Sequence, residues 1–205
     1  LTDAEVDVAV DFTHPDVVMD DIRWCVRHAI HIVVGTTGLT PADLDEIRAL
    51  IEEEGNESNV FVAPNFAIGA VLASHLASLA APWFDTSEII EFHHDGKVDA
   101  PSCTAMHTAE RLAEASADRA PDPTQVAVLE GSRGGLGPSG IRVHAVRMRG
   151  MVASQEVVLG TTGQTLTLRH DTIDRSSFMP GVLLAVRSVA DRPGVTVGLD
   201  ALLGL

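Results

Sequence analysis

The sequence predicts an α/β fold, in which a partial doubly wound parallel sheet is followed by an α+β region with a mixed sheet. Over residues 1–66, short and almost continuously apolar segments alternate with helical patterns. This alternation is typical of parallel strands that are covered on both faces. After Asn65, apolar segments joined by short connections become frequent, as in antiparallel pairing. The chain has 205 residues, of which 45% are hydrophobic, enough for one large domain or two small ones with a core.

The first region is expected to contain three strands and two helices. The strands are the apolar segments 6–12, 30–34 and 60–63. A first helix is expected over residues 16–29, where apolar residues recur at helical spacing. A second helix is expected to end near Glu54. Its start is predicted by a helix-start pattern, with Thr40 as N-cap, Pro41 at the first helical position and Asp43 at the third.

The second region is expected to mix helices with strands. Helices are expected over residues 68–79, 104–116 and 178–190, and the last of them is expected to return to the first region. Strands are expected over residues 88–94, 141–148, 155–159 and 165–170. The short connections between the last three strands favour antiparallel pairing among them. Gly-Thr-Thr-Gly at 160–163 lies between two of these strands and predicts a hairpin turn.

Charge and composition argue against several functions. The chain has 14 basic and 29 acidic residues and a formal net charge of −15, which disfavours a nucleic-acid or anionic-membrane partner. It has no run of 18 apolar residues and no basic, apolar signal segment, so neither a membrane span nor secretion is expected. The two cysteines, Cys25 and Cys103, form neither a disulfide framework nor a metal-ligand spacing. We therefore expect a cytoplasmic protein without a metal site.

A second copy of Gly-Thr-Thr-Gly, at residues 35–38, lies between a predicted strand and a predicted helix. The carboxyl ends of strands are where open α/β sheets bind ligands. Glycine is also common in such loops for geometric reasons alone. By itself this motif therefore leaves both a ligand site and an ordinary turn open.

The segment 91–105, Glu-Phe-His-His-Asp-Gly-Lys-Val-Asp-Ala-Pro-Ser-Cys-Thr-Ala, is the most informative part of the chain. His93 and His94 leave a predicted strand, and a predicted helix opens after Pro101. The first amides of a helix, with nearby hydroxyls, bind anions, so a cationic or proton-donating cluster is expected to face a carboxylate or phosphate site. Adjacent strand residues point to opposite faces, so only one histidine is expected to enter a given cleft. The alternative is a solvated turn followed by an ordinary capped helix.

Lys97 is the single lysine of the chain, against 14 − 1 = 13 arginines. A GC-rich genome explains why lysine is scarce, but it does not explain why the one lysine lies four residues after His93. Arginine supplies charge equally well but does not readily release a proton, whereas lysine does. The position of Lys97 therefore indicates chemistry.

The pattern Glu-x-His-His-x-x-Lys-x-Asp-Ala-Pro-Ser-x-Thr-Ala resembles the signature of the 4-hydroxy-tetrahydrodipicolinate (dihydrodipicolinate) reductase family. Three further segments resemble the same family in order, namely residues 35–38, 63–69 and 169–181. The last of them is similar to actinobacterial members in particular. The resemblance covers nearly all of the chain and is far more specific than a lone glycine motif.

The resemblance implies that the chain reduces 4-hydroxy-tetrahydrodipicolinate to tetrahydrodipicolinate with NADH or NADPH, on the route to diaminopimelate and lysine. It implies His93 as the acid/base residue and Lys97 as the proton donor. The substrate-binding residues that it implies are His94, Ser102, Cys103 and Thr104. The cofactor-binding residues that it implies are Gly35, Thr36, Thr37, Ala63, Pro64, Asn65 and Phe66. These roles agree with the chemistry, because a dianionic substrate needs cationic or amide partners and hydride addition needs a proton source.

The resemblance also implies a domain organisation. Residues 1–66 are expected to form an incomplete, Rossmann-like dinucleotide-binding domain, and residues 67–175 a substrate-binding and oligomerisation domain. Residues 176–205 are expected to return to the dinucleotide-binding domain. A homotetramer is the assembly that the family implies.

Two features depart from the family pattern. The family begins with a glycine-rich loop that binds the cofactor pyrophosphate, and this sequence starts roughly forty residues later, after that loop. An exposed sheet edge is expected as a result. Cys103 occupies a position where the family has glycine. These departures leave open a non-catalytic remnant or oligomeric scaffold that has lost cofactor binding, and also a different oxidoreductase with the same two-domain plan.

Overall fold

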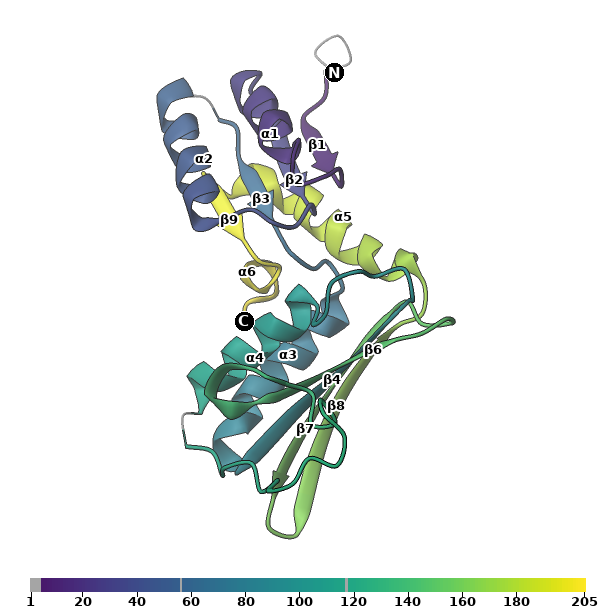
Figure 1. Cartoon of the computed structure of the whole chain (residues 1–205). Helices are drawn as coiled ribbons and strands as arrows, with labels where there is room; N and C mark the ends of the chain where they lie inside the picture. Colours follow the sequence, from purple (N-terminus) through teal and green to yellow (C-terminus); the bar gives the residue numbers. More distant parts are fainter. Residues whose placement is uncertain (1–4, 56, 117) are drawn as a thin grey trace. The chain divides into compact units, whose positions relative to one another are not determined.

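The computed structural model describes residues 5–55, 57–116 and 118–205. The chain divides into two compact units, which we describe separately (Figure 1). Unit 1 consists of Leu1–Ile68 and Phe178–Leu205, and unit 2 consists of Gly69–Ser177. The C-terminal segment therefore belongs to the same unit as the N-terminal segment.

Unit 1 is built on a four-stranded parallel sheet, which we call sheet A. Its strands are β1 (Val8–Asp11), β2 (His31–Val34), β3 (Val60–Val62) and β9 (Val195–Val197), in the order β1-β2-β3-β9. The first three strands were predicted, with slightly longer bounds. β9 was missed, because three residues between Gly194 and Gly198 are too few to show a strand periodicity.

The helices of unit 1 pack around this sheet. They are α1 (Val18–Arg27), α2 (Pro41–Glu54), α5 (Met179–Ser188) and α6 (Asp200–Leu203). One core joins the buried faces of α1 and α2 to strand residues such as Ile32 and Val60. Val33 and Phe61 point to the other face and are also fully buried, as expected for strands covered on both sides.

Helix α2 begins as the sequence predicts. The Thr40 hydroxyl accepts a hydrogen bond from the Asp43 amide at 3.2 Å, and the Asp43 carboxylate accepts one from the Thr40 amide at 2.7 Å. This reciprocal pair is a capping box. The helix ends at Gly55, whose φ of +60° lies in the left-handed region that favours glycine. Helix α5 is shorter than the helix predicted over residues 178–190, because 3₁₀ turns at Arg175–Phe178 and Val189–Asp191 flank it.

Among the described residues, β1 has a single hydrogen-bonded neighbour and forms an edge of sheet A. Val10 on this strand is 47% exposed. A shallow pocket of about 340 Å³ runs along the same strand, with Asp11, Trp24 and Cys25 in its lining. Burial raises the pKa of the Cys25 thiol to about 11, with a smaller contribution from the carboxylates of Asp21 and Asp11, so this thiol stays protonated.

Unit 2 contains a five-stranded mixed sheet, which we call sheet B. Its strands are β4 (Thr86–His93), β5 (Gly135–Leu136), β6 (Arg142–Arg147), β7 (Ala153–Thr161) and β8 (Gln164–Thr172), in the order β5-β6-β4-β7-β8. β7 and β8 form the expected hairpin, closed at Thr161–Gln164. The expectation that β6 pairs antiparallel with the following strand is wrong, because β6 pairs parallel with β4. A helix connects these two strands, and helical crossovers produce parallel pairs.

That connecting helix is α4 (Cys103–Ala115), and it packs on sheet B together with α3 (Ile68–Ala80). Its small residues Ala105 and Ala109 are fully buried against strand residues that include Ile89. Ser102 caps α4, so the helix begins one residue earlier than predicted. This packing holds the start of α4 close to the end of β4. No helix in the part of the chain that the structure describes is long and apolar enough to cross a membrane.

Candidate active site

The end of strand β4 carries the acid/base candidate. Side chains alternate along a strand, so Ile89, Glu91 and His93 lie on one face of sheet B. Ile89 and Glu91 are fully buried, and the His93 side chain is 15% exposed. His94 lies beyond the strand in an exposed turn, with its ring against Gly96. The adjacent histidines therefore occupy different surroundings, and His93 alone belongs to the face that carries Glu91.

Glu91 is the centre of a hydrogen-bonded cluster. Its Oε2 contacts His93 Nδ1, while its Oε1 accepts hydrogen bonds from the Arg147 guanidinium at 2.8 Å and the Ser102 amide at 3.2 Å. Burial raises the pKa of Glu91, but the hydrogen bonds from His93 and Arg147 outweigh it and hold the pKa below its ordinary value. The carboxylate is therefore ionised in the interior.

Lys97 lies in the segment that joins β4 to α4. Its amide donates to the His94 carbonyl at 3.1 Å, which closes the turn. Its Nζ lies 2.7 and 2.9 Å from the two carboxylate oxygens of Asp99, and this hydrogen bond lowers the pKa of Asp99. The Asp99 carbonyl accepts from Arg147 at 2.6 Å. Arg147 thus connects the Lys97 segment to Glu91, and through Glu91 to His93.

The start of α4 carries the substrate-binding candidates Ser102, Cys103 and Thr104. Ser102 is buried, and its hydroxyl accepts from the Ala105 amide at 3.2 Å as the N-cap. Its own amide already donates to Glu91. Cys103 is exposed and Thr104 is half-buried. Ser102 therefore shapes the helix start, and the more accessible parts of this start belong to Cys103 and Thr104.

The structure thus brings together His93, Ser102 and the Lys97 segment. The contacts that join them come from Glu91 and Arg147, which were not predicted as site residues. Glu91 was available to sequence reasoning, because a residue two positions before His93 on a strand shares its face. Arg147 gave no such signal, since it lies 56 residues from Glu91 in the chain.

The cofactor-binding candidates lie in unit 1, after the carboxyl ends of β2 and β3. Gly35, Thr36 and Thr37 follow β2. The Thr36 hydroxyl is buried and donates to the Asp11 carboxylate at 2.6 Å. Burial raises the pKa of Asp11, but hydrogen bonds from Thr36 and Thr13 outweigh it and lower the pKa. Thr37 is exposed, so it is the residue of this loop with an accessible hydroxyl.

The second loop, residues 63–66, follows β3. Ala63 and Phe66 are buried, Asn65 is half-buried and Pro64 is exposed. The Asn65 side chain accepts from the Ala67 amide at 2.8 Å. Phe66 packs against Phe12, with ring centroids 5.6 Å apart, and Phe12 is itself 53% exposed. A Cβ at Gly35 would lie 2.1 Å from the Phe12 ring, so a larger residue at this position would require the ring to move.

These features fit a nucleotide cofactor. Both loops leave the carboxyl ends of neighbouring parallel strands, which is where open α/β sheets bind ligands. The carboxyl ends of β1, β2 and β3 are followed by the exposed residues Phe12, Thr37 and Pro64. This end of the sheet therefore has an apolar surface with one hydroxyl. Gly38 has a φ of +103°, which allows the loop to turn into α2.

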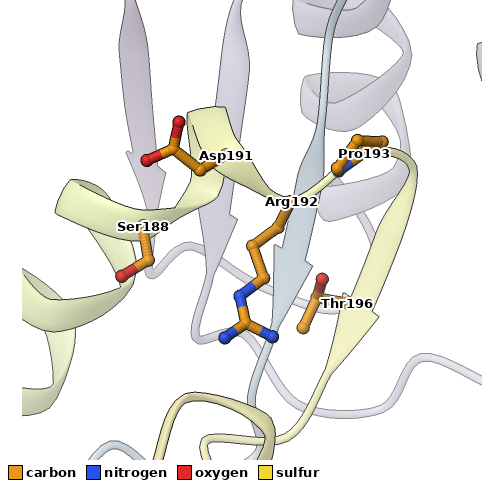
Figure 2. Close-up of a pocket in the computed structure, with 5 residues that line it drawn as sticks. All are labelled: Ser188, Asp191, Arg192, Pro193 and Thr196. Atoms are coloured by element: carbon orange, nitrogen blue, oxygen red, sulfur yellow. The ribbon is translucent and has the colours of Figure 1, made fainter.

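A separate pocket of about 550 Å³ in unit 1 is lined by Ser188, Asp191, Arg192, Pro193 and Thr196 (Figure 2). Figure 2 shows the Arg192 side chain extending between Ser188 and Thr196, while the Asp191 carboxylate points away from it. None of the predicted site residues lines this pocket. In the described ranges, no group of three or more His, Cys, Asp or Glu side chains is arranged to hold a metal ion.

Comparisons with known proteins match both units. Residues 1–66 match the family model described as dihydrodipicolinate reductase, N-terminus, and residues 68–203 match dihydrodipicolinate reductase, C-terminus. The chain is 52% identical over 206 residues to 4-hydroxy-tetrahydrodipicolinate reductase from Mycolicibacterium gilvum and 51% identical over 209 residues to that from Corynebacterium urealyticum. Each alignment covers 100% of this chain and 83% of the relative.

Solved structures agree with these matches. A dipicolinate-bound dihydrodipicolinate reductase from Paenisporosarcina sp. TG-14 superposes with a TM-score of 0.81 and 42% identity, over 95% of this chain and 73% of that chain. A probable dehydrogenase from Thermotoga maritima, at 10% identity and a TM-score of 0.57 over 98% of this chain and 75% of that chain, shares the fold. With family models matched over nearly its whole length and relatives above 50% identical over the whole of this chain, the chain belongs to the dihydrodipicolinate reductase family.

Proposed function

We propose that this chain reduces 4-hydroxy-tetrahydrodipicolinate to tetrahydrodipicolinate with a reduced nicotinamide cofactor. Its relatives are named 4-hydroxy-tetrahydrodipicolinate reductase. One structural observation carries the proposal at the level of residues. The Glu91 carboxylate joins His93, at the end of β4, to Ser102, at the start of α4. A proton-transfer group and a helix start that suits carboxylates are thereby held in one place. Nothing in the comparisons supports the alternative of a non-catalytic remnant.

His93 and Lys97 are the proposed proton-transfer residues. The His93 ring is half-buried and contacts Glu91 through Nδ1, which leaves Nε2 to face a substrate. The Lys97 side chain is 23% exposed and its ammonium is held by Asp99, so it presents a localised positive charge. When bound, the nicotinamide would supply a hydride to the conjugated ring system that forms once the 4-hydroxyl group of the substrate has left as water. His93 and Lys97 stabilise the negative charge that develops on the substrate and deliver the proton that neutralises it.

The substrate carboxylates are proposed to bind at the start of α4 and at the cations near it. Helix N-termini attract anions through their free amides and the helix dipole. Cys103 and Thr104 supply this accessible helix start, and His94 lies exposed in the preceding turn. Ser102 contributes by capping the helix and fixing where it begins.

The proposed cofactor residues are Gly35, Thr36, Thr37, Ala63, Pro64, Asn65 and Phe66. Of these, Thr37 and Pro64 are the exposed ones, and we propose that they contact the nicotinamide half. Thr36 acts indirectly by holding Asp11. We further propose that unit 1 serves as the dinucleotide-binding unit and unit 2 as the substrate-binding unit, in a cytoplasmic homotetramer. Sedimentation of the purified protein tests the tetramer.

The activity is tested by following oxidation of NADH and NADPH with enzymatically generated substrate. We expect oxidation that depends on that substrate, together with binding of dipicolinate as a competitive inhibitor. Comparing kcat/KM for the two nucleotides identifies the preferred cofactor. Absence of turnover with both nucleotides, together with no nucleotide binding up to millimolar concentration, contradicts the proposal.

Cys103 provides a prediction on substrate affinity. Its side chain is exposed at the first position of α4, where we expect it to crowd an approaching carboxylate. Cys103→Gly is therefore expected to lower KM for the substrate by roughly three- to tenfold, or about 1 kcal/mol, with kcat nearly unchanged. Cys103→Ser keeps a side chain of similar size and is expected to retain the KM of the unmodified protein. Equal KM values for the glycine variant and the unmodified protein contradict the prediction.

A further inference from the structure

We propose that Glu91 is a positioning residue, which fixes the tautomer and the orientation of the His93 ring. This inference rests on the proposed function, since it concerns how His93 is prepared for that reaction. Glu91 lies two residues before His93 on β4, on the same face of sheet B. It acts through His93 and is not proposed to touch the substrate.

The contact between the two side chains selects one form of the ring. A neutral imidazole has one N–H donor and one acceptor nitrogen, while a carboxylate can only accept. Because His93 Nδ1 faces Glu91 Oε2, the proton of the neutral ring is held on Nδ1. Nε2 is then the nitrogen that exchanges a proton with a substrate, and the ring cannot rotate without losing its partner.

The carboxylate is itself held from several sides. Its second oxygen accepts from the Arg147 guanidinium on β6 and from the Ser102 amide before α4. Arg147 also donates to the carbonyl of Asp99. Glu91 is fully buried, so water does not compete for these bonds. Strand β6 and the start of α4 therefore determine where the carboxylate lies, and the carboxylate determines where the ring lies.

A glutamine at this position is expected to select the opposite tautomer. Arg147 and Ser102 both donate to Oε1, so they hold the amide oxygen of a glutamine on their side. The amide nitrogen then faces His93 Nδ1 and donates to it. This forces the proton of the neutral ring onto Nε2, so the nitrogen that faces the substrate can no longer accept a proton.

The same strand offers a matched control. Glu88 lies on the opposite face of β4 and accepts from His144 at 2.7 Å and from Arg133. This is the same combination of carboxylate, histidine and arginine, away from His93. Glu88→Gln therefore tests the general cost of replacing a paired carboxylate on β4, without changing the ring of His93.

The first experiment compares steady-state kinetics of Glu91→Gln and Glu88→Gln in the full chain. For Glu91→Gln we expect kcat to fall roughly 10- to 100-fold, while the inhibition constant of dipicolinate changes by less than about threefold. For Glu88→Gln we expect both quantities to match the unmodified protein. Unchanged kcat in Glu91→Gln overturns the inference, and so does a loss in dipicolinate affinity as large as the loss in kcat.

The second experiment asks whether Glu91 acts through His93. In a His93→Ala background, Glu91→Gln is expected to cause no further loss of kcat, since the ring that it positions is gone. A further loss equal to that seen with His93 present overturns the inference. Glu91→Asp provides a second variant if the glutamine does not fold, because it keeps a charge for Arg147 but withdraws the carboxylate from the ring. Its kcat is also expected to fall.

The third experiment does not depend on turnover. The ¹⁵N resonances of the His93 ring, recorded with the ring neutral, are expected to show the proton on Nδ1 in the unmodified protein and on Nε2 in Glu91→Gln. Identical tautomers in the two proteins overturn the inference. If the unmodified protein shows no activity but the tautomer changes as expected, the proposed function fails while the positioning by Glu91 stands.

Discussion

His93→Ala is expected to lower kcat by about 10² to 10⁴-fold, the usual contribution of a positioned acid/base group. The ring is anchored at the end of β4 through Nδ1, so its removal deletes the proposed proton-transfer group without removing the helix start that is proposed to bind carboxylates. Affinity for dipicolinate is therefore expected to change by less than about fivefold, a free-energy change of about 1 kcal/mol. Steady-state kinetics with saturating nucleotide and calorimetric titration of dipicolinate measure the two quantities.

His107→Ala is the matched control for this prediction. His107 lies on α4, with a side chain that is 57% exposed, and its ring lies 3.9 Å from Glu110 on the helix surface. Its replacement is expected to leave kcat and dipicolinate affinity unchanged. A kcat for His93→Ala equal to that of the control rules out His93 as the acid/base residue.

Lys97→Arg and Lys97→Ala are expected to separate charge from proton donation. Arginine keeps the positive charge but does not readily release a proton, so Lys97→Arg is expected to lower kcat by about 10²-fold with KM changed less than about threefold. Lys97→Ala removes both properties and leaves Asp99 without this partner. It is expected to lower kcat by at least as much and to raise KM by about tenfold, or about 1.4 kcal/mol.

Arg149→Ala serves as the control for charge near this segment. The Arg149 side chain is 93% exposed and pairs with Asp95, so its loss changes the local charge outside the predicted site. Its kinetic constants are expected to match those of the unmodified protein, because exposed ion pairs contribute little. If Lys97→Arg retains full kcat, Lys97 supplies charge alone and the proton comes from another group.

The elements that depend on local sequence signals were predicted well. The Thr40 cap, with Pro41 and Asp43, determines the start of α2 through contacts within four residues. The hairpin at 161–164 was likewise indicated by its glycine-containing turn. The strands β1, β2 and β3 were predicted because buried parallel strands are nearly continuous apolar segments.

Pairing between distant segments was not predictable in the same way. The side-chain pattern of β6 is compatible with either neighbour direction, and its parallel pairing with β4 depends on how α4 crosses between them. Glu91 shows the same limit within the site. Its burial is possible only because Arg147, Ser102 and His93 surround it, and Arg147 comes from a strand 56 residues away. Local patterns therefore singled out His93 and Lys97 as candidates but not the groups that hold them.

The position of β4 in sheet B has a consequence for motion. β4 lies between β6 and β7, and its backbone is hydrogen-bonded along both sides. Its amides therefore exchange with solvent only when two ladders open together, which makes it among the slowest-opening parts of unit 2. The segment 94–101, by contrast, lies outside the strands. The Arg147 side chain joins it to the sheet by a hydrogen bond to the Asp99 carbonyl. We therefore expect the segment that carries Lys97 to adjust more readily than His93 when a substrate binds.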